Sequence, residues 1–224
     1  MRRAAFALVV GAAACAPALR PLPPPPPGAA PEDSATLAAR SRAASGKTQH
    51  EPSKDARSAL VQEAMEAGQR CEEAAPASAP CDYALALALG VQAREHPTTA
   101  AKGLPAMVDL LQRANKSDPQ QDHAGPARVL ALVLVRAPGW PLGPGDPEAG
   151  LKAAQQAARL FPAYAPNQLA LSEALLVAGD RTGSEAAARR GLEAARAAAA
   201  AGDEPDAGDW VRDAEALAAG KSPR

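Results

Sequence analysis

Apolar residues recur at helical spacing through most of this chain. After Ser53, the first such run has intervals of four, three and four residues, at Leu60, Ala64, Ala67 and Cys71. This spacing sets all four side chains on one face of an α-helix. Because proline and glycine interrupt the pattern repeatedly, the sequence predicts a series of helices of ordinary length separated by turns.

The interruptions define about seven to eight predicted helices. The first runs from about residue 53 to the breaks at Pro76 and Pro80, and the others are expected at residues 81–95, 98–114, 125–136, 146–161, 167–178, 182–201 and 206–218. The helix at 125–136 is apolar nearly all round, so we expect it to lie centrally. The helix at 206–218 has one apolar and one charged face, which suits a terminal capping helix.

Two Gly-Asp pairs indicate a repeat. Gly145-Asp146 and Gly179-Asp180 lie 34 residues apart, a predicted helix follows each pair, and Pro162 ends the first of these helices. A 34-residue period of helix, turn and helix is typical of tetratricopeptide repeats. Small residues that let paired helices approach closely fall in the same register, at Ala157, Ser172, Ser184 and Gly191. The predicted fold is therefore all-α, a solenoid of antiparallel helix pairs similar to tetratricopeptide repeats.

Composition supports a helical domain and disfavours one class of partner. The chain of 224 residues has a net charge of −1 and 3% aromatic residues. Alanine and leucine, its main apolar residues, have high helix propensity. The sequence contains no basic block or basic helix face, which argues against a nucleic-acid partner. The predicted folded domain covers residues 53–220 and leaves a short tail at residues 221–224.

The N-terminus has the features of a targeting segment. Arg2 and Arg3 precede a short apolar run, and small residues lead up to Cys15. The run is too short to span a bilayer, and small residues after such a run mark a cleavage site. Residues 1–14 resemble a bacterial lipoprotein signal, which implies that Cys15 becomes the lipidated first residue, anchored in the membrane and facing the periplasm. Ala16 favours the outer membrane by the same resemblance. The alternative is an ordinary secretory signal with a chance cysteine.

Residues 15–52 are predicted to form a tether. Pro21 and the run at residues 23–27 favour an extended polyproline conformation that does not pack into a core. Residues 31–52 are mostly small and polar, with no clear apolar period, so we expect at most a transient helix at residues 35–44. The whole segment is therefore placed outside the folded domain.

Cys71 and Cys81 lie near the facing ends of two consecutive predicted helices. In an exported protein this arrangement favours a disulfide, and a pair of buried free thiols is the alternative. No other cysteine or histidine stands nearby at the spacing of a metal site. His50, His96 and His123 are far apart in the sequence and are expected to be solvated.

The sequence contains no motif of a catalytic or cofactor site. The stretch around Gly143 and Gly145 lacks the lysine and the preceding strand of a phosphate-binding loop. No local serine, histidine and aspartate motif is present. We therefore predict a protein that is not an enzyme, with no catalytic residue, metal or cofactor.

One loop stands out from a plain helical repeat. About eight residues connect the helices on either side of it, where a tetratricopeptide unit has three or four, and its notable residues are Trp140, Pro141, Gly145 and Asp146. Either the Trp140 indole packs on a neighbouring helix and fixes the loop, or the loop lines a binding groove. We predict the first, because large aromatic residues are scarce here and valuable for packing, with the loop backbone at the edge of a groove.

A family resemblance rests on this region. The lipoprotein-like leader, the helix pair with cysteines, Pro138-Gly139-Trp140-Pro141, and Gly145-Asp146 ahead of an amphipathic helix resemble the T component of TRAP transporters, the TatT family. The resemblance implies an all-helical periplasmic lipoprotein that contacts the solute-binding protein of an uptake system and holds an apolar ligand in a central cavity. Homo-oligomerisation stays open.

A second hypothesis needs no resemblance. Stacked helix pairs create extended concave surfaces that bind proteins. The chain would then be a lipid-anchored scaffold for assembly of cell-envelope complexes. A ligand carrier needs a closed apolar cavity, whereas a scaffold needs an open polar groove.

Overall fold

The computed structural model describes residues 32–202 and 204–221. Within them nine α-helices follow one another, with one 3-10 turn, Pro97–Thr99, and no strand. The helices are α1 (Ser34–Lys47), α2 (Lys54–Ala74), α3 (Ala79–Glu95), α4 (Ala100–Ser117), α5 (Gln121–Arg136), α6 (Pro147–Leu160), α7 (Ala165–Val177), α8 (Arg181–Ala201) and α9 (Ala207–Ala218). The leader at residues 1–14 and Cys15 lie outside the described residues.

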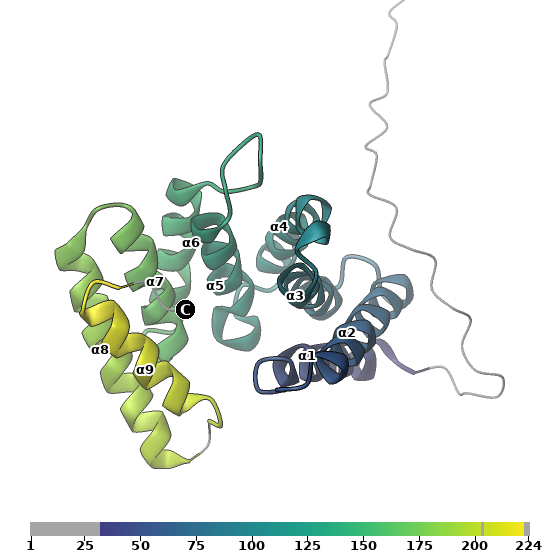
Figure 1. Ribbon diagram of the computed structural model, residues 1–224, viewed down its shortest axis with the longest axis horizontal. Helices are drawn as coiled ribbons and strands as arrows, with labels where there is room; N and C mark the ends of the chain where they lie inside the picture. The colour runs from purple at the N-terminus through teal and green to yellow at the C-terminus, as the bar shows by residue number, and fades with distance from the viewer. Residues whose placement is uncertain (1–31, 203, 222–224) are drawn as a thin grey trace, which may run out of the picture.

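The helices form a curved double row (Figure 1). Each helix packs on the next, and the backbones of the odd-numbered helices also lie close to one another, whereas those of the even-numbered helices do not. This difference places α1, α3, α5, α7 and α9 on the inner side of the curve and α2, α4, α6 and α8 on the outer side. The even-numbered helices meet through long side chains, as between α2 and α4 and between α4 and α6. The prediction of an all-α helical-repeat solenoid is confirmed.

The repeated Gly-Asp pairs each begin an outer helix. The carboxylate of Asp146 accepts a hydrogen bond from Ala149 N at 3.0 Å, and that of Asp180 accepts one from Gly183 N at 2.8 Å. An aspartate at this position satisfies a backbone N–H that the helix itself leaves unpaired. Ser172, in the small-residue register, is fully buried, and its hydroxyl donates to Ser184 O at 2.9 Å.

The folded domain starts earlier than the sequence predicts. Helix α1 lies in the segment assigned to the tether, yet its Leu37 and Ala38 are buried in one cluster with Cys71 and Cys81. Ser41 is fully buried, and its hydroxyl donates to Ala64 O at 2.8 Å and lies 3.2 Å from Ala84 O. The prediction of a tether up to residue 52 is therefore wrong, and α1 adds one helix to the seven to eight expected after residue 53. The packing face of α1 is built from small residues, so it has no run of large apolar residues.

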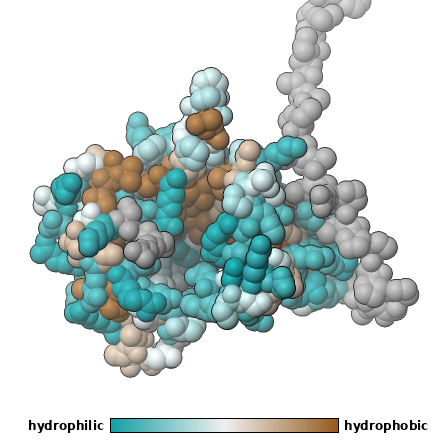
Figure 2. Space-filling model, in the orientation of Figure 1, coloured by the Kyte–Doolittle hydropathy of each residue, from teal (hydrophilic) through white to brown (hydrophobic). Residues whose placement is uncertain are grey.

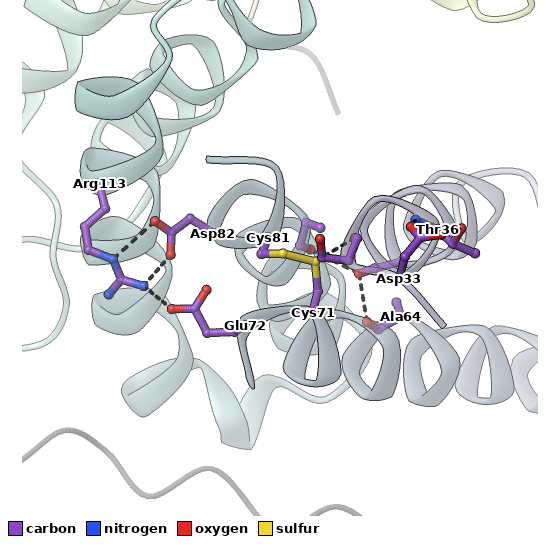
Figure 3. Close-up of a disulfide and its surroundings, with 11 residues drawn as sticks. Asp33, Thr36, Ala64, Cys71, Glu72, Cys81, Asp82 and Arg113 are labelled. Carbon is purple, nitrogen blue, oxygen red and sulfur yellow. Dashed lines mark hydrogen bonds and ion pairs between the residues drawn. A yellow bond between two sulfur atoms is a disulfide. The ribbon is translucent and has the colours of Figure 1, made fainter. Parts of the chain in front are cut away.

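The predicted disulfide between Cys71 and Cys81 is present in the structure, with the two Cα atoms 5.2 Å apart. It joins the last turn of α2 to the first turn of α3. The residue after each cysteine is acidic, and both carboxylates meet one guanidinium from α4 (Figure 3). Arg113 donates to Glu72 Oε1 at 2.7 Å and to both oxygens of the fully buried Asp82.

This cluster places two carboxylates beside each other, which affects their protonation. Burial, followed by the negative charge of Asp82, raises the pKa of Glu72. Hydrogen bonding to Asp82 raises the pKa of Arg113. The disulfide and this ion cluster together fasten α2, α3 and α4.

The largest apolar cluster runs from α1 to α7, and a smaller one joins α7, α8 and α9 around Leu217. Both are dominated by alanine and leucine, so close helix contact replaces large side chains. Among the described helices, none combines the length and the apolar character needed to cross a membrane.

Candidate functional site

The connection between α5 and α6 is built to project from the solenoid. Helix α5 ends at Arg136, and Ala137 is extended because it precedes Pro138. The two ends of the loop are then joined by backbone hydrogen bonds. Gly145 N donates to Pro138 O at 2.9 Å, and Asp146 N donates to Leu134 O at 2.9 Å.

Glycine is required where these two ends meet. A Cβ atom on Gly145 would collide with the carbonyl oxygen of Ala137, and one on Gly143 would lie 2.7 Å from the carbonyl oxygen of Pro138. The same close approach forms an isolated bridge between Gly139 and Gly145. The base of the loop is therefore fixed by backbone contacts alone.

The tip of the loop turns at the cis peptide bond between Trp140 and Pro141, where Leu142 N donates to Gly139 O at 3.0 Å. The side chain of Trp140 is 91% exposed and that of Leu142 is 78% exposed. Figure 1 shows the loop projecting beyond the ends of α5 and α6. The prediction that the Trp140 indole packs on a neighbouring helix is wrong, because the loop is anchored at its base and its tip points away from the helices.

The loop carries no charge, and the arginine that precedes it is paired with a glutamate. No ionisable residue occurs from residue 137 to residue 145. At its start, the Arg136 guanidinium donates to both oxygens of the buried Glu173, at 2.7 and 2.6 Å. This hydrogen bonding raises the pKa of Arg136. The tip is therefore a neutral apolar surface.

Apolar surface also gathers below the loop. Figure 2 shows it in the hollow between the half of the curved double row formed by α1–α4 and the half formed by α5–α9. Several apolar residues on the inner helices α3, α5 and α7 pack against the core while remaining partly exposed; they include Leu87, Val91, Val129, Val133 and Leu171. These side chains keep part of their apolar surface exposed in this hollow.

The two halves meet at a strained segment that the sequence did not reveal. Asp122, His123 and Ala124, at the start of α5, all have positive φ, at 50°, 53° and 62°. Non-glycine residues adopt this conformation at a cost of roughly 1–2 kcal/mol each. Surrounding contacts must therefore hold the segment in place.

Arg128 supplies most of those contacts. Its guanidinium donates to Asp122 O at 3.2 Å, to Asp122 Oδ2 at 3.1 Å and to Asn167 Oδ1 at 3.1 Å, and it lies 5.1 Å from the centre of the Tyr164 ring. From α3, Tyr83 donates its hydroxyl to Asp122 Oδ2 at 2.6 Å. Burial raises the pKa of Tyr83. The one charged residue in the otherwise apolar run at 124–135 was the signal for this junction.

The three histidines have different surroundings. His123 stacks on Tyr164, with ring centres 4.5 Å apart, and His96 is exposed at the end of α3. His50 lies in the loop between α1 and α2, and its Nε2 is 2.9 Å from Asp206 Oδ1 at the start of α9. The structure therefore brings His50 and Asp206 together from opposite ends of the fold.

The four candidate loop residues fall into two groups. Trp140 and Pro141 form the exposed tip, whereas Gly145 and Asp146 form the base and begin α6. Only the first pair is placed to touch a partner. Comparison with known proteins adds no relative to this picture: no family model matches the chain, and no curated protein matches it.

Proposed function

We propose that this protein is a non-enzymatic lipoprotein of the bacterial cell envelope that serves as a binding accessory of a TRAP-type solute uptake system. In this proposal, the Trp140 loop docks on a protein partner, the solute-binding protein. The observation that carries it is the exposure of Trp140 and Leu142, at 91% and 78%, on a loop whose base is fixed.

A large exposed aromatic residue on a fixed loop has the properties of a binding hot spot. Tryptophan is enriched among the residues that dominate interface energies. A loop already held in one conformation loses little conformational entropy on binding. Because the loop is uncharged, we expect this contact to depend weakly on salt.

The nature of the partner rests on resemblance. The loop sequence and the lipoprotein-like leader are similar to those of TRAP T components, which associate with periplasmic solute-binding proteins. An anchor on Cys15 in the outer membrane, facing the periplasm, would place the solenoid beside such a protein. The apolar surface in the hollow (Figure 2) supports an apolar ligand as a second occupant.

The test measures binding of the purified mature protein to a TRAP-type solute-binding protein from the same organism. Replacing Trp140 and Leu142 together with alanine should weaken this binding by at least tenfold, as expected for a hot spot. Val177→Ala is the matched control, because Val177 is also an exposed apolar residue, at 47%, but lies outside the loop. Equal affinities of the wild type and the double variant would reject the docking role of the loop.

Loss of self-association in the double variant would instead identify a second copy of this chain as the occupant. Light scattering on the same samples separates the two outcomes. A wild-type protein that stays monomeric and binds no solute-binding protein would remove the main support for the proposal.

The scaffold function remains the second candidate, and one observation favours it. A hollow of about 550 Å³ over α1 and α2 is open to solvent and is lined by the charged residues Lys47, Glu51 and Glu63 together with the apolar residues Ala56, Ala59 and Leu60. An open groove of this mixed character suits contact with a protein rather than storage of a ligand. Neighbouring genes for a solute-binding protein and a permease would favour the uptake role, and their absence would favour the scaffold.

A further inference from the structure

The two ends of the solenoid meet through three side chains. His50, between α1 and α2, lies 2.9 Å from Asp206 Oδ1 through its Nε2 and 4.0 Å from Asp209 Oδ2 through its Nδ1. His50 and Asp206 are 156 residues apart in the sequence. The contact therefore links the loop between α1 and α2 to the start of α9.

The carboxylate of Asp206 is turned toward His50 and not toward its own helix. Asp206 occupies the N-cap position of α9 but makes no side-chain capping hydrogen bond. Asp146 and Asp180, at the same position of α6 and α8, both make one. Asp206 thus forgoes the contact that its residue type usually makes at a helix start.

We propose that His50, Asp206 and Asp209 form a binding site for a divalent transition metal of the zinc type, which ties the two ends of the solenoid together. One ligand atom from each residue lies within 4.8 Å of the other two. Ligand atoms around a tetrahedral zinc ion, each about 2.0–2.1 Å from the metal, are about 3.3 Å from one another. His50 Nε2 and Asp206 Oδ1, 2.9 Å apart, lie close to this separation. The 4.0 Å to Asp209 Oδ2 is measured from the other ring nitrogen, Nδ1, so the side chains must turn to bring both carboxylates to the one nitrogen that binds the metal.

The ligand set selects the class of metal. One imidazole and two carboxylates suit zinc, whereas magnesium and calcium prefer oxygen ligands alone. The three side chains are 56%, 41% and 38% exposed, in the order His50, Asp206 and Asp209. They can therefore rotate to close the remaining distance, and water can fill the fourth position.

The neighbouring Arg212 guanidinium does not occupy the Asp209 oxygen that faces His50. Arg212 pairs with Oδ1 of Asp209, while Oδ2 is the oxygen that faces His50. Both carboxylates come from the first turn of one helix, so a metal would bind α9 at two points and the N-terminal hairpin at one. Coordination of both side chains to the metal would then replace the exposed hydrogen bond between His50 and Asp206.

The test is zinc titration of the full mature chain, prepared without an affinity tag and stripped with a chelator. Calorimetry should show one equivalent of zinc bound, with magnesium giving no comparable signal. His50→Ala and Asp206→Asn should each lower the zinc affinity at least tenfold. His96→Ala is the matched control, since His96 is exposed outside the cluster, and it should bind zinc as the wild type does.

Two further readouts separate a lost site from a lost fold. Cobalt should give the strong visible absorption of a four-coordinate site in the wild type, and this absorption should be missing in His50→Ala. Zinc should raise the melting temperature of the wild type and not that of His50→Ala, while the two metal-free proteins give the same circular dichroism spectrum. Equal zinc affinities of the wild type and His50→Ala would overturn the proposal.

Discussion

Removal of the Trp140 side chain is expected to leave the fold almost unaffected. The side chain is 91% exposed, so only about a tenth of its surface of roughly 250 Å² is covered by the rest of the protein. At about 25 cal/mol per Å² of buried apolar area, the covered part contributes roughly 0.6 kcal/mol. We therefore expect Trp140→Ala to lower the free energy of unfolding by less than about 1 kcal/mol.

Leu111→Ala provides the contrast for this measurement. Leu111 is fully buried on α4, and truncation of a buried leucine costs about 2–5 kcal/mol. Urea unfolding should be followed by far-ultraviolet circular dichroism, because the chain has two tryptophans and Trp140→Ala removes one fluorescent probe. A loss above about 2 kcal/mol in Trp140→Ala, at an unchanged slope with denaturant, would refute the reasoning.

Four further predictions concern the anchor, the disulfide and the two polar clusters. Cys15→Ser should release the protein from the membrane fraction or leave the precursor uncleaved, whereas an uncleaved native protein without acyl chains would contradict lipidation. Alanine at both Cys71 and Cys81 should lower the free energy of unfolding by up to about 3 kcal/mol, measured by urea unfolding. Tyr83→Phe removes the hydroxyl that donates to Asp122 and should lower it by about 1–2 kcal/mol. The raised pKa of Glu72 means that the folded state binds the Glu72 proton more tightly than the unfolded state does. The contribution of Glu72 to stability should therefore fall as the pH rises from about 4.5, the ordinary pKa of glutamate, through the raised pKa. Glu72→Gln should abolish this part of the fall in melting temperature with pH.

The helix order was predictable because its causes are local. Asp146 and Asp180 cap their helices through their own side chains, and Pro138 ends α5 through its effect on the preceding residue. Such interactions need only a few neighbouring residues, so the sequence contains all the information. The start of α2 at Lys54, capped by Ser53, follows the same rule.

The parts that sequence reasoning missed depend on distant partners. Ser41 makes α1 part of the domain only because backbone oxygens of α2 and α3 lie next to its hydroxyl. The strained turn at residues 122–124 is held by Arg128 together with groups from α3 and α7. Neither partner can be identified from spacing along the chain. For the strained turn, the available signal was Arg128, a single charged residue in an apolar run, whereas the buried face of α1 combines small apolar residues with Ser41 and Ser45.

The Trp140 loop shows how a correct premise led to a wrong expectation. The prolines at 138, 141 and 144 do indicate a stiff loop, and we expected stiffness to require an aromatic anchor. The structure supplies the anchor from the backbone instead, through the hydrogen bond from Gly145 to Pro138. Because the indole is not needed to hold the loop, it is free to face solvent. A fixed apolar tip stabilises little within its own chain, which is the reason for proposing that it contacts another molecule.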